Sequence, residues 1–181
     1  QHFTFTPYYF YKSHLYFNKE QRYNEGYNGI GCNVTYQPFS FLAFSISGEY
    51  ASLMGVKQKV DSALELFFPS EKAKRSLTGI YFAPQLFFYT NPENVFYGGI
   101  GFGGIFLNTL SVNAIEMPNT GQNMFLWHAF IGNRFLLFPS IIFQVEVNFA
   151  SNFKKVAPVF GGDKTFSQYF ITLQLGVGAL F

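Results

Sequence analysis

The most restrictive feature of this sequence is an alternation of apolar with small or polar residues, repeated in segments too short for membrane helices. In the last segment, residues 168–181, every odd position is apolar or aromatic, while the even positions are mostly Gln, Thr and Gly. A repeat of two residues is that of a β-strand with two different faces. One face suits lipid and the other suits a narrow, partly polar interior.

The composition indicates that these strands cross a membrane. Hydrophobic residues make up 49% of the chain and charged residues only 12%, with 26 Phe and 12 Tyr. Soluble domains carry about a quarter charged residues, so a soluble chain this poor in charge would dissolve badly. A membrane helix needs about 20 consecutive apolar residues, whereas Gly, Asn, Gln, Thr or a charge interrupts every apolar stretch here. A barrel strand needs only about 9–11 residues, so we predict a transmembrane β-barrel.

Eight segments of this kind follow one another along the chain. They cover residues 2–17, 26–36, 39–50, 75–90, 95–107, 122–138, 141–149 and 168–181. Bacterial outer-membrane barrels have an even number of antiparallel strands, and in hydrocarbon the last strand must pair with the first to leave no open edge. The prediction is therefore an all-β fold: an eight-stranded antiparallel transmembrane up-and-down β-barrel, formed by a single domain spanning residues 1–181.

The connections between the segments alternate in length. Short ones lie at 37–38, 91–94 and 139–140, and longer ones at about 18–25, 51–74, 108–121 and 154–164. Outer-membrane barrels have short periplasmic turns and longer extracellular loops. We therefore expect both termini to be periplasmic, and the chain to lie in a bacterial outer membrane. No signal peptide is visible before Gln1, so we expect that it has already been removed.

The end of the chain resembles the C-terminal signal that the outer-membrane assembly machinery reads. That signal has a polar residue, then a Gly, an apolar residue and a terminal aromatic at fixed spacing. The matching residues here are Gln174, Gly176, Ala179 and Phe181. The resemblance implies that the assembly machinery is a partner during insertion.

Two further segments resemble the OmpW/OmpA-like superfamily of small eight-stranded outer-membrane barrels. "VFYGGIGFG" (95–103) is similar to the strand of that family with an aromatic followed by spaced glycines, and "APQLFFYT" (83–90) resembles its Pro-containing strand before a short turn. The resemblance covers about residues 26–181 and does not extend to the loops. The OmpW branch is associated with passage of small hydrophobic molecules, so the resemblance implies a narrow channel. The alternative is a non-transporting structural or adhesive barrel, or an accessory subunit of a larger outer-membrane complex.

Polar residues on the predicted inner faces form the main candidate site. An eight-stranded barrel is just wide enough for side chains to fill it, so these residues form either a polar path or a packed internal network. In a packed network, Arg134 and Glu146 on adjacent strands are the leading ion pair. The candidate residues are Lys12, His14, Glu49, Gln85, His128, Arg134, Gln144 and Glu146.

Other chemistries receive little support from the sequence. The three histidines lack ligand spacing, and the single Cys32 falls on the predicted lipid face, so no metal or cofactor is expected. Lipid-modifying barrels resemble this architecture, but the place of their His-x-Ser reads Phe149–Ser151 with no His, so no enzymatic activity is expected. The glycines at 98–104 lack the helix that a phosphate-binding loop requires. The net charge of +2 without a basic cluster gives no reason to expect nucleic acid.

Two of the longer connections suggest partners. In 51–74, Val56, Val60, Leu64 and Phe67–Phe68 recur at near-helical spacing, which predicts an amphipathic helix on the outer leaflet or a docking site for a partner protein. The basic, Gly-rich segment 154–164 is either a solvated loop or a contact for lipopolysaccharide. Outer-membrane lipid, lipopolysaccharide and a membrane protein complex are the expected partners. Pro7 and Pro84 fall inside strands, where each removes a ladder hydrogen bond and marks a candidate lateral opening.

Overall fold

The chain folds into long strands throughout. The computed structural model describes residues 2–17, 21–60, 64–69, 73–91, 93–118, 120–156 and 166–181. The long strands are β1 (His2–Phe17), β2 (Gln21–Phe39), β3 (Leu42–Val60), β6 (Ser76–Asn91), β7 (Asn94–Leu107), β10 (Gln122–Phe138), β11 (Ile141–Val156) and β12 (Phe166–Leu180). The short strands are β4 (Leu64–Pro69), β5 (Ala73–Lys74), β8 (Ser111–Val112) and β9 (Ile115–Glu116). Across these ranges, no helix has the length and apolar character needed to cross a bilayer.

The long strands close into a barrel. They follow the order β2-β1-β12-β11-β10-β7-β6-β3, and β2 pairs with β3 to complete the ring. All of these pairings are antiparallel, including the pairing of the first strand with the last. The predicted fold class, an eight-stranded antiparallel barrel, is confirmed.

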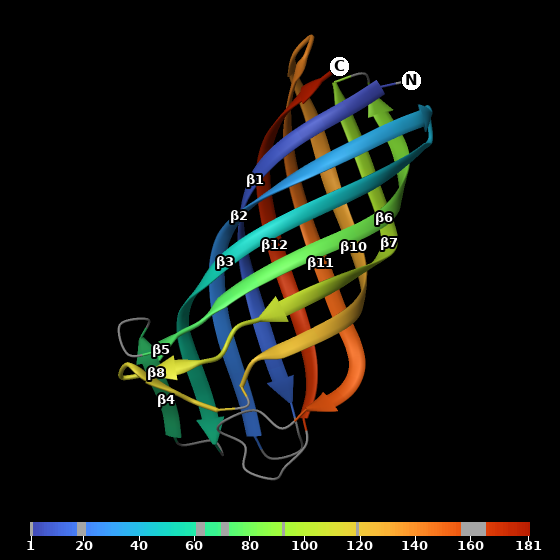
Figure 1. Cartoon of the computed structure of the whole chain (residues 1–181). Helices are drawn as coiled ribbons and strands as arrows, with labels where there is room; N and C mark the ends of the chain where they lie inside the picture. The colour runs from blue at the N-terminus through green and yellow to red at the C-terminus, as the bar shows by residue number, and fades with distance from the viewer. Residues whose placement is uncertain are drawn as a thin grey trace.

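The two ends of the barrel differ in construction. Both chain termini lie at one end with the short β2–β3, β6–β7 and β10–β11 connections, which we call the turn end (Figure 1). The opposite end, which we call the loop end, carries the short strands. There β4 pairs with the far part of β3, and β5, β8 and β9 form a separate three-stranded sheet.

The wall of the barrel has an apolar outside and a mixed inside. Along β1, inward and outward residues alternate strictly from Thr4 to Tyr11. Large apolar side chains face outward on every barrel strand, among them Phe5, Ile46, Phe102 and Leu173, each between 45% and 60% exposed. A continuous apolar surface of this kind on a closed barrel is what a lipid bilayer requires.

Several strand boundaries differ from those predicted. β2 begins at Gln21, within the expected 18–25 connection, and β11 runs to Val156, beyond the expected end at 149. The turn expected at 37–38 is wrong, because both residues belong to β2 and the turn lies at Ser40–Phe41. Strands lengthen because each added residue pairs with its neighbour, and polar side chains do not stop this pairing outside the hydrocarbon. Residues 157–164 of the basic connection lie outside the described ranges.

The amphipathic helix predicted within 51–74 is wrong. Residues 51–60 continue β3, and Gly55 to Val60 pair with Pro69 to Leu64 of β4. The β2–β3 pairing contains a bulge in this region, since Gly26–Gly55 is followed by Tyr27–Leu53 and Met54 is the extra residue. Leu53 and Val56 are consequently both buried although they differ in parity. The near-helical spacing itself runs across two strands: Val56 and Val60 lie on β3, where a step of four residues also keeps one face, and Leu64 and Phe67–Phe68 lie on β4.

Candidate functional site

The predicted interior residues all lie inside the barrel. They are 7% exposed or less and come from β1, β3, β6, β10 and β11. The structure distributes them over three clusters, near the middle, the turn end and the loop end. The residues are Lys12, His14, Glu49, Gln85, His128, Arg134, Gln144 and Glu146.

The central cluster joins Lys12 and Glu49 in a buried ion pair. The Lys12 ammonium donates to Glu49 Oε1, and it also donates to the Tyr81 hydroxyl at 2.8 Å. Tyr81 in turn donates to Glu49 Oε1 at 2.6 Å. The ammonium also lies over the rings of Phe10 and Tyr81, at 5.2 and 5.0 Å from their centroids. Opposite charges, a hydroxyl and two aromatic faces thus share one small volume, which offsets the desolvation of both ions.

His128 lies beside this cluster. Its ring makes an edge contact with the Tyr81 ring at 5.2 Å, and its Nδ1 is 3.1 Å from the Asn148 amide. Within the described ranges, no group of three or more His, Cys, Asp or Glu side chains converges around it or elsewhere.

The turn-end cluster is built around Arg134. Its Nε donates to Gln144 at 3.0 Å and its Nη2 to Gln85 at 3.1 Å. The guanidinium stacks on the rings of Phe87 and Tyr97, at 5.0 and 4.7 Å. Tyr97 touches both members of the ion pair that the sequence suggested: the Arg134 guanidinium lies over its ring, and its hydroxyl donates to Glu146 at 2.8 Å.

The loop-end cluster contains two charged residues that the sequence analysis missed. Arg75 Nη1 donates to both oxygens of Glu25 at 3.0 Å, and the Tyr27 hydroxyl donates to the same carboxylate at 2.5 Å. His14 connects to it through Nδ1, 3.5 Å from Glu25, while its Nε2 lies 3.0 Å from Gln168. Arg75 also donates to the backbone carbonyls of Asn108 and Thr120, which fastens the 108–121 connection to the barrel.

The alternation in the sequence could have identified both Arg75 and Glu25 as inward-facing residues. Arg75 has the same odd parity as Gln85 in the predicted strand 75–90, so it belonged on the inner face. Glu25 lies between Tyr23 and Tyr27, and all three are buried. Extending the alternation of the predicted segment 26–36 by one residue upstream would have included Glu25.

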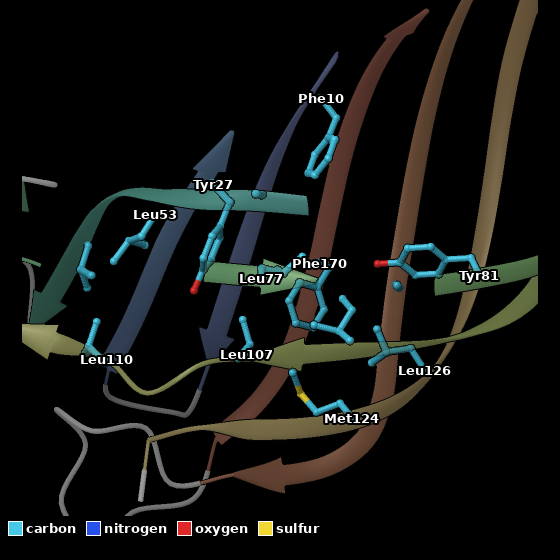
Figure 2. Packing of buried hydrophobic residues seen from close by; sticks show 14 of the residues in the cluster. Phe10, Tyr27, Leu53, Leu77, Tyr81, Leu107, Leu110, Met124, Leu126 and Phe170 are labelled. Atoms are coloured by element: carbon cyan, nitrogen blue, oxygen red, sulfur yellow. The ribbon is translucent and has the colours of Figure 1, made fainter. Parts of the chain in front are cut away.

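Apolar side chains pack around these polar clusters inside the barrel. Figure 2 shows Phe10 of β1, Phe170 of β12, and Leu126 and Met124 of β10 in one cluster, which also contains Tyr27 and Leu77. A second cluster nearer the turn end contains Ala43, Ala83, Phe87, Tyr97 and Phe130. The lumen is therefore packed with side chains in both halves.

Both prolines lie where the hydrogen-bonded pairing of two strands is interrupted, although the register continues on either side. The β1–β12 pairing steps from Phe5–Ala179 to Tyr8–Gly176, passing over Thr6 and Pro7. The β6–β7 pairing likewise passes over Ala83 and Pro84. Beside Pro7 the outer wall carries a mostly apolar groove of about 550 Å³, lined by residues that include Tyr9, Ile30 and Phe143.

The residues of the C-terminal signal lie on β12 and at its end. Gln174 and Gly176 face the interior, Ala179 is half-buried, and the Phe181 side chain is 76% exposed. The Phe181 backbone closes the barrel seam: its N–H donates to the Phe3 carbonyl at 2.8 Å, and its carbonyl accepts from the Phe3 N–H at 3.1 Å.

Comparison with solved structures identifies this architecture. The chain aligns over 99% of its length with 95% of the outer-membrane protein OprG from Pseudomonas aeruginosa, with a TM-score of 0.64 and 13% identity. The chain has the fold of the small outer-membrane β-barrels. Neisserial surface protein A shares this barrel fold with a TM-score of 0.60 at 12% identity, covering 97% of this chain and 96% of that one. Ail of Yersinia pestis gives 0.51 at 12% identity, with 98% of both chains covered. The sequence matches no protein-family model and no curated protein.

This barrel fold and the apolar wall together assign a location. Exposed side chains such as Ile100, Phe125 and Ile131 require a lipid environment. Closed antiparallel barrels with such walls span bacterial outer membranes. The protein is therefore a bacterial outer-membrane barrel.

Proposed function

We propose that this outer-membrane barrel does not conduct solutes along its axis and serves as a scaffold that presents its loop-end sheets to partners. The observation that carries the proposal is the filled lumen. Two apolar clusters and the Lys12–Glu49 ion pair lie in the interior, and at the loop end Arg75 donates to the Asn108 carbonyl of the 108–121 connection. The interior of an eight-stranded barrel is only wide enough for side chains to fill it, or to hold one small ligand.

The loop end offers the larger surface for a partner. β2 and β3 pair as far as Gln21–Val60, beyond the last pairing of β3 with β6 at Ser52–Ser76. β4 widens this projecting sheet by pairing beside β3, and the β5–β8–β9 sheet lies at the same end. In this proposal the loop end faces outward and the termini face the periplasm, so a soluble partner meets the loop end and lipopolysaccharide surrounds it.

Conductance in planar bilayers tests this proposal. The refolded full chain should give no stable channels across voltages and salts. Phe10→Ser combined with Phe170→Ser removes two side chains of the larger cluster and should open a leak, which shows that silence of the unmodified chain is not failed insertion. Steady channels from the unmodified chain, abolished by enlarging Gly101, would contradict a closed barrel.

A second candidate is lateral passage of small hydrophobic solutes at Pro7. The skipped pairing between β1 and β12 and the adjoining apolar groove support it. Pro7→Val supplies an N–H to the seam, so it should slow the uptake of a small hydrophobic dye into liposomes containing the protein. Equal uptake by Pro7→Val, the unmodified protein and protein-free liposomes would rule out this route.

A further inference from the structure

Six residues on six neighbouring strands follow one another through backbone pairing at the loop end of the barrel. Directly paired residues share one face of a sheet, so the six lie on one face. Three of them are cations and one is a carboxylate. We call these residues the loop-end row; in order from β11 through β12, β1, β2 and β3 to β4, they are Lys155, Ser167, Phe17, Arg22, Lys59 and Glu65.

The loop-end row lies on the outer face of the barrel wall. Arg22 is exposed, whereas the next residue, Tyr23, is 2% exposed and faces the interior. On β12, Ser167 has the same parity as Ile171, an outward residue that is 43% exposed. The Arg22 guanidinium lies over the Phe17 ring, 5.8 Å from its centroid, so an aromatic face supports this cation at the surface.

The outer surface carries its cations at this end. Within the described ranges, Lys12 and Arg134 are the only Lys or Arg residues away from the loop end, and both are buried. On the other side of the barrel, Ser76 at the start of β6 and Asn123 near the start of β10 are uncharged. The cations of the loop-end row outnumber its one carboxylate, so this side of the barrel favours an anionic partner.

The height of the row above the apolar wall indicates which anion it meets. Ser167 lies four residues beyond the exposed Ile171 on β12, and Arg22 lies eight residues beyond the exposed Ile30 on β2. At about 3.3 Å per residue and a strand tilt of about 40°, these steps raise the row by roughly 10–20 Å. The polar layer of a phospholipid leaflet is only about 5–8 Å thick, so the row lies beyond phospholipid phosphates.

We propose that the loop-end row binds the phosphorylated core oligosaccharide of lipopolysaccharide. This oligosaccharide extends outward from lipid A and carries its phosphates above the level of phospholipid head groups. Arg binds phosphate as a two-pronged donor and Lys as a point charge. From β11 to β3 the row spans about 19 Å, which suits an extended anion better than a single phosphate. The inference rests on the outward orientation of the loop end in the proposed function.

Calorimetric titration of the refolded full chain in phosphatidylcholine nanodiscs tests the proposal. The probes are the phosphorylated core oligosaccharide released from lipopolysaccharide by mild acid, the same oligosaccharide after dephosphorylation, and inorganic phosphate. The phosphorylated oligosaccharide should bind at least tenfold more tightly than the other two, and its affinity should fall as salt rises. Equal affinity for the two oligosaccharides would overturn the role of charge. Inorganic phosphate binding as tightly as the phosphorylated oligosaccharide would overturn the extended site.

Surface variants locate the binding. Arg22→Gln and Lys59→Gln should each weaken binding of the phosphorylated oligosaccharide about fivefold, and Glu65→Gln should strengthen it. Lys74→Gln is the matched control, because Lys74 is exposed at the same end but pairs with Ser111 in the separate three-stranded sheet. Unchanged affinity in the first two variants, folded as judged by heat-modifiable migration, would overturn the row. An equal loss in Lys74→Gln would also overturn it, because charge at any position would then suffice.

The orientation of the loop end is measured independently on intact cells. In a Cys32→Ser background, Lys74→Cys should react with a membrane-impermeant maleimide if this end faces outward. Oligosaccharide binding in nanodiscs without labelling on cells would overturn lipopolysaccharide as the ligand. Labelling on cells without oligosaccharide binding would overturn the row and leave the proposed function intact. Neither measurement depends on whether the barrel conducts.

Discussion

At the scale of single residues, the interior is organised by charges that cannot reach water. Lys12 is 2% exposed and Glu49 is 4% exposed, yet each is a full charge when ionised. A buried ion pair gains little over an apolar pair, but one ion left alone is strongly destabilising. The residues of each cluster should therefore be energetically coupled.

Replacing Lys12 tests this coupling. Lys12→Met should destabilise the barrel by about 3–5 kcal/mol, because Glu49 remains buried without its cation. The measurement is the free energy of unfolding in urea for the protein refolded in detergent. The double variant Lys12→Met with Glu49→Gln should recover much of the loss, and a single variant as stable as the unmodified chain would contradict the ion pair.

At the scale of the strands, glycine allows neighbouring side chains to enter the lumen. A Cβ at Gly101 of β7 would lie 2.5 Å from Ala83 Cβ and 2.6 Å from His128 Nε2. Gly48 of β3 is also in a strand, but no heavy atom lies within 4 Å of the place its Cβ would take. A methyl group would therefore meet crowded surroundings at Gly101 and open space at Gly48.

This contrast predicts different outcomes for the same substitution. Gly101→Ala should cost about 1–3 kcal/mol through overpacking, because the nearby atoms belong to the opposite strand and a packed ring. Gly48→Ala should be neutral or stabilise by about 0.4–1 kcal/mol through the unfolded chain. Thermal unfolding of both variants in the same detergent decides the point, and equal destabilisation would mean that the lumen at Gly101 is looser than described.

At the scale of the whole molecule, the stability of the barrel depends on the pairing of β1 with β12, which closes the ring, and on contact of the outer wall with lipid. The seam joins strands from opposite ends of the chain, and the Phe3–Phe181 backbone pair is its last link. The membrane is met by the outward residues of every barrel strand. Each dependence can be tested separately.

Two changes at the terminus separate the assembly signal from the seam. Phe181→Ala keeps the backbone pair with Phe3 and removes only the ring, whereas deletion of Phe181 removes both. If the ring is read during assembly, both variants should reach the membrane at reduced levels, as judged by heat-modifiable migration. Normal levels of Phe181→Ala with reduced levels of the deletion would assign the effect to the seam alone.

Lipid contact of the outer face of β11 can be tested by introducing a charged side chain there. Val145→Arg should destabilise the barrel by about 2–4 kcal/mol if that outer face meets the middle of the bilayer. Asn28→Arg on the outer face of β2 is the control, because Asn28 pairs with Tyr11 and Ser52 beyond the apolar part of that strand. Near the membrane interface the cost should fall to about 0–1 kcal/mol. An unchanged unfolding midpoint for Val145→Arg would place the face outside lipid.

The sequence by itself determined the fold class, the pairing of the first strand with the last, and which residues of most strands face inward. These follow from a local repeat of two residues together with the need to close every strand edge in lipid. The two-residue repeat correctly placed all eight candidate lumen residues, from Lys12 to Glu146, on inward-facing positions of the barrel.

Only the tertiary structure decided the bulge at Met54, the length of β3 and the partners of the interior charges. A bulge changes parity without a distinct residue signal. Residues 51–74 imitated a helix because apolar positions on β3 and on its partner β4 happened to follow one another at steps of three and four residues. Interior partners depend on the stagger of strands around the whole barrel: Lys12 finds Glu49 and Arg75 finds Glu25 across sequence separations of 37 and 50 residues. A local pattern contains no information about that stagger, because it arises from ring closure.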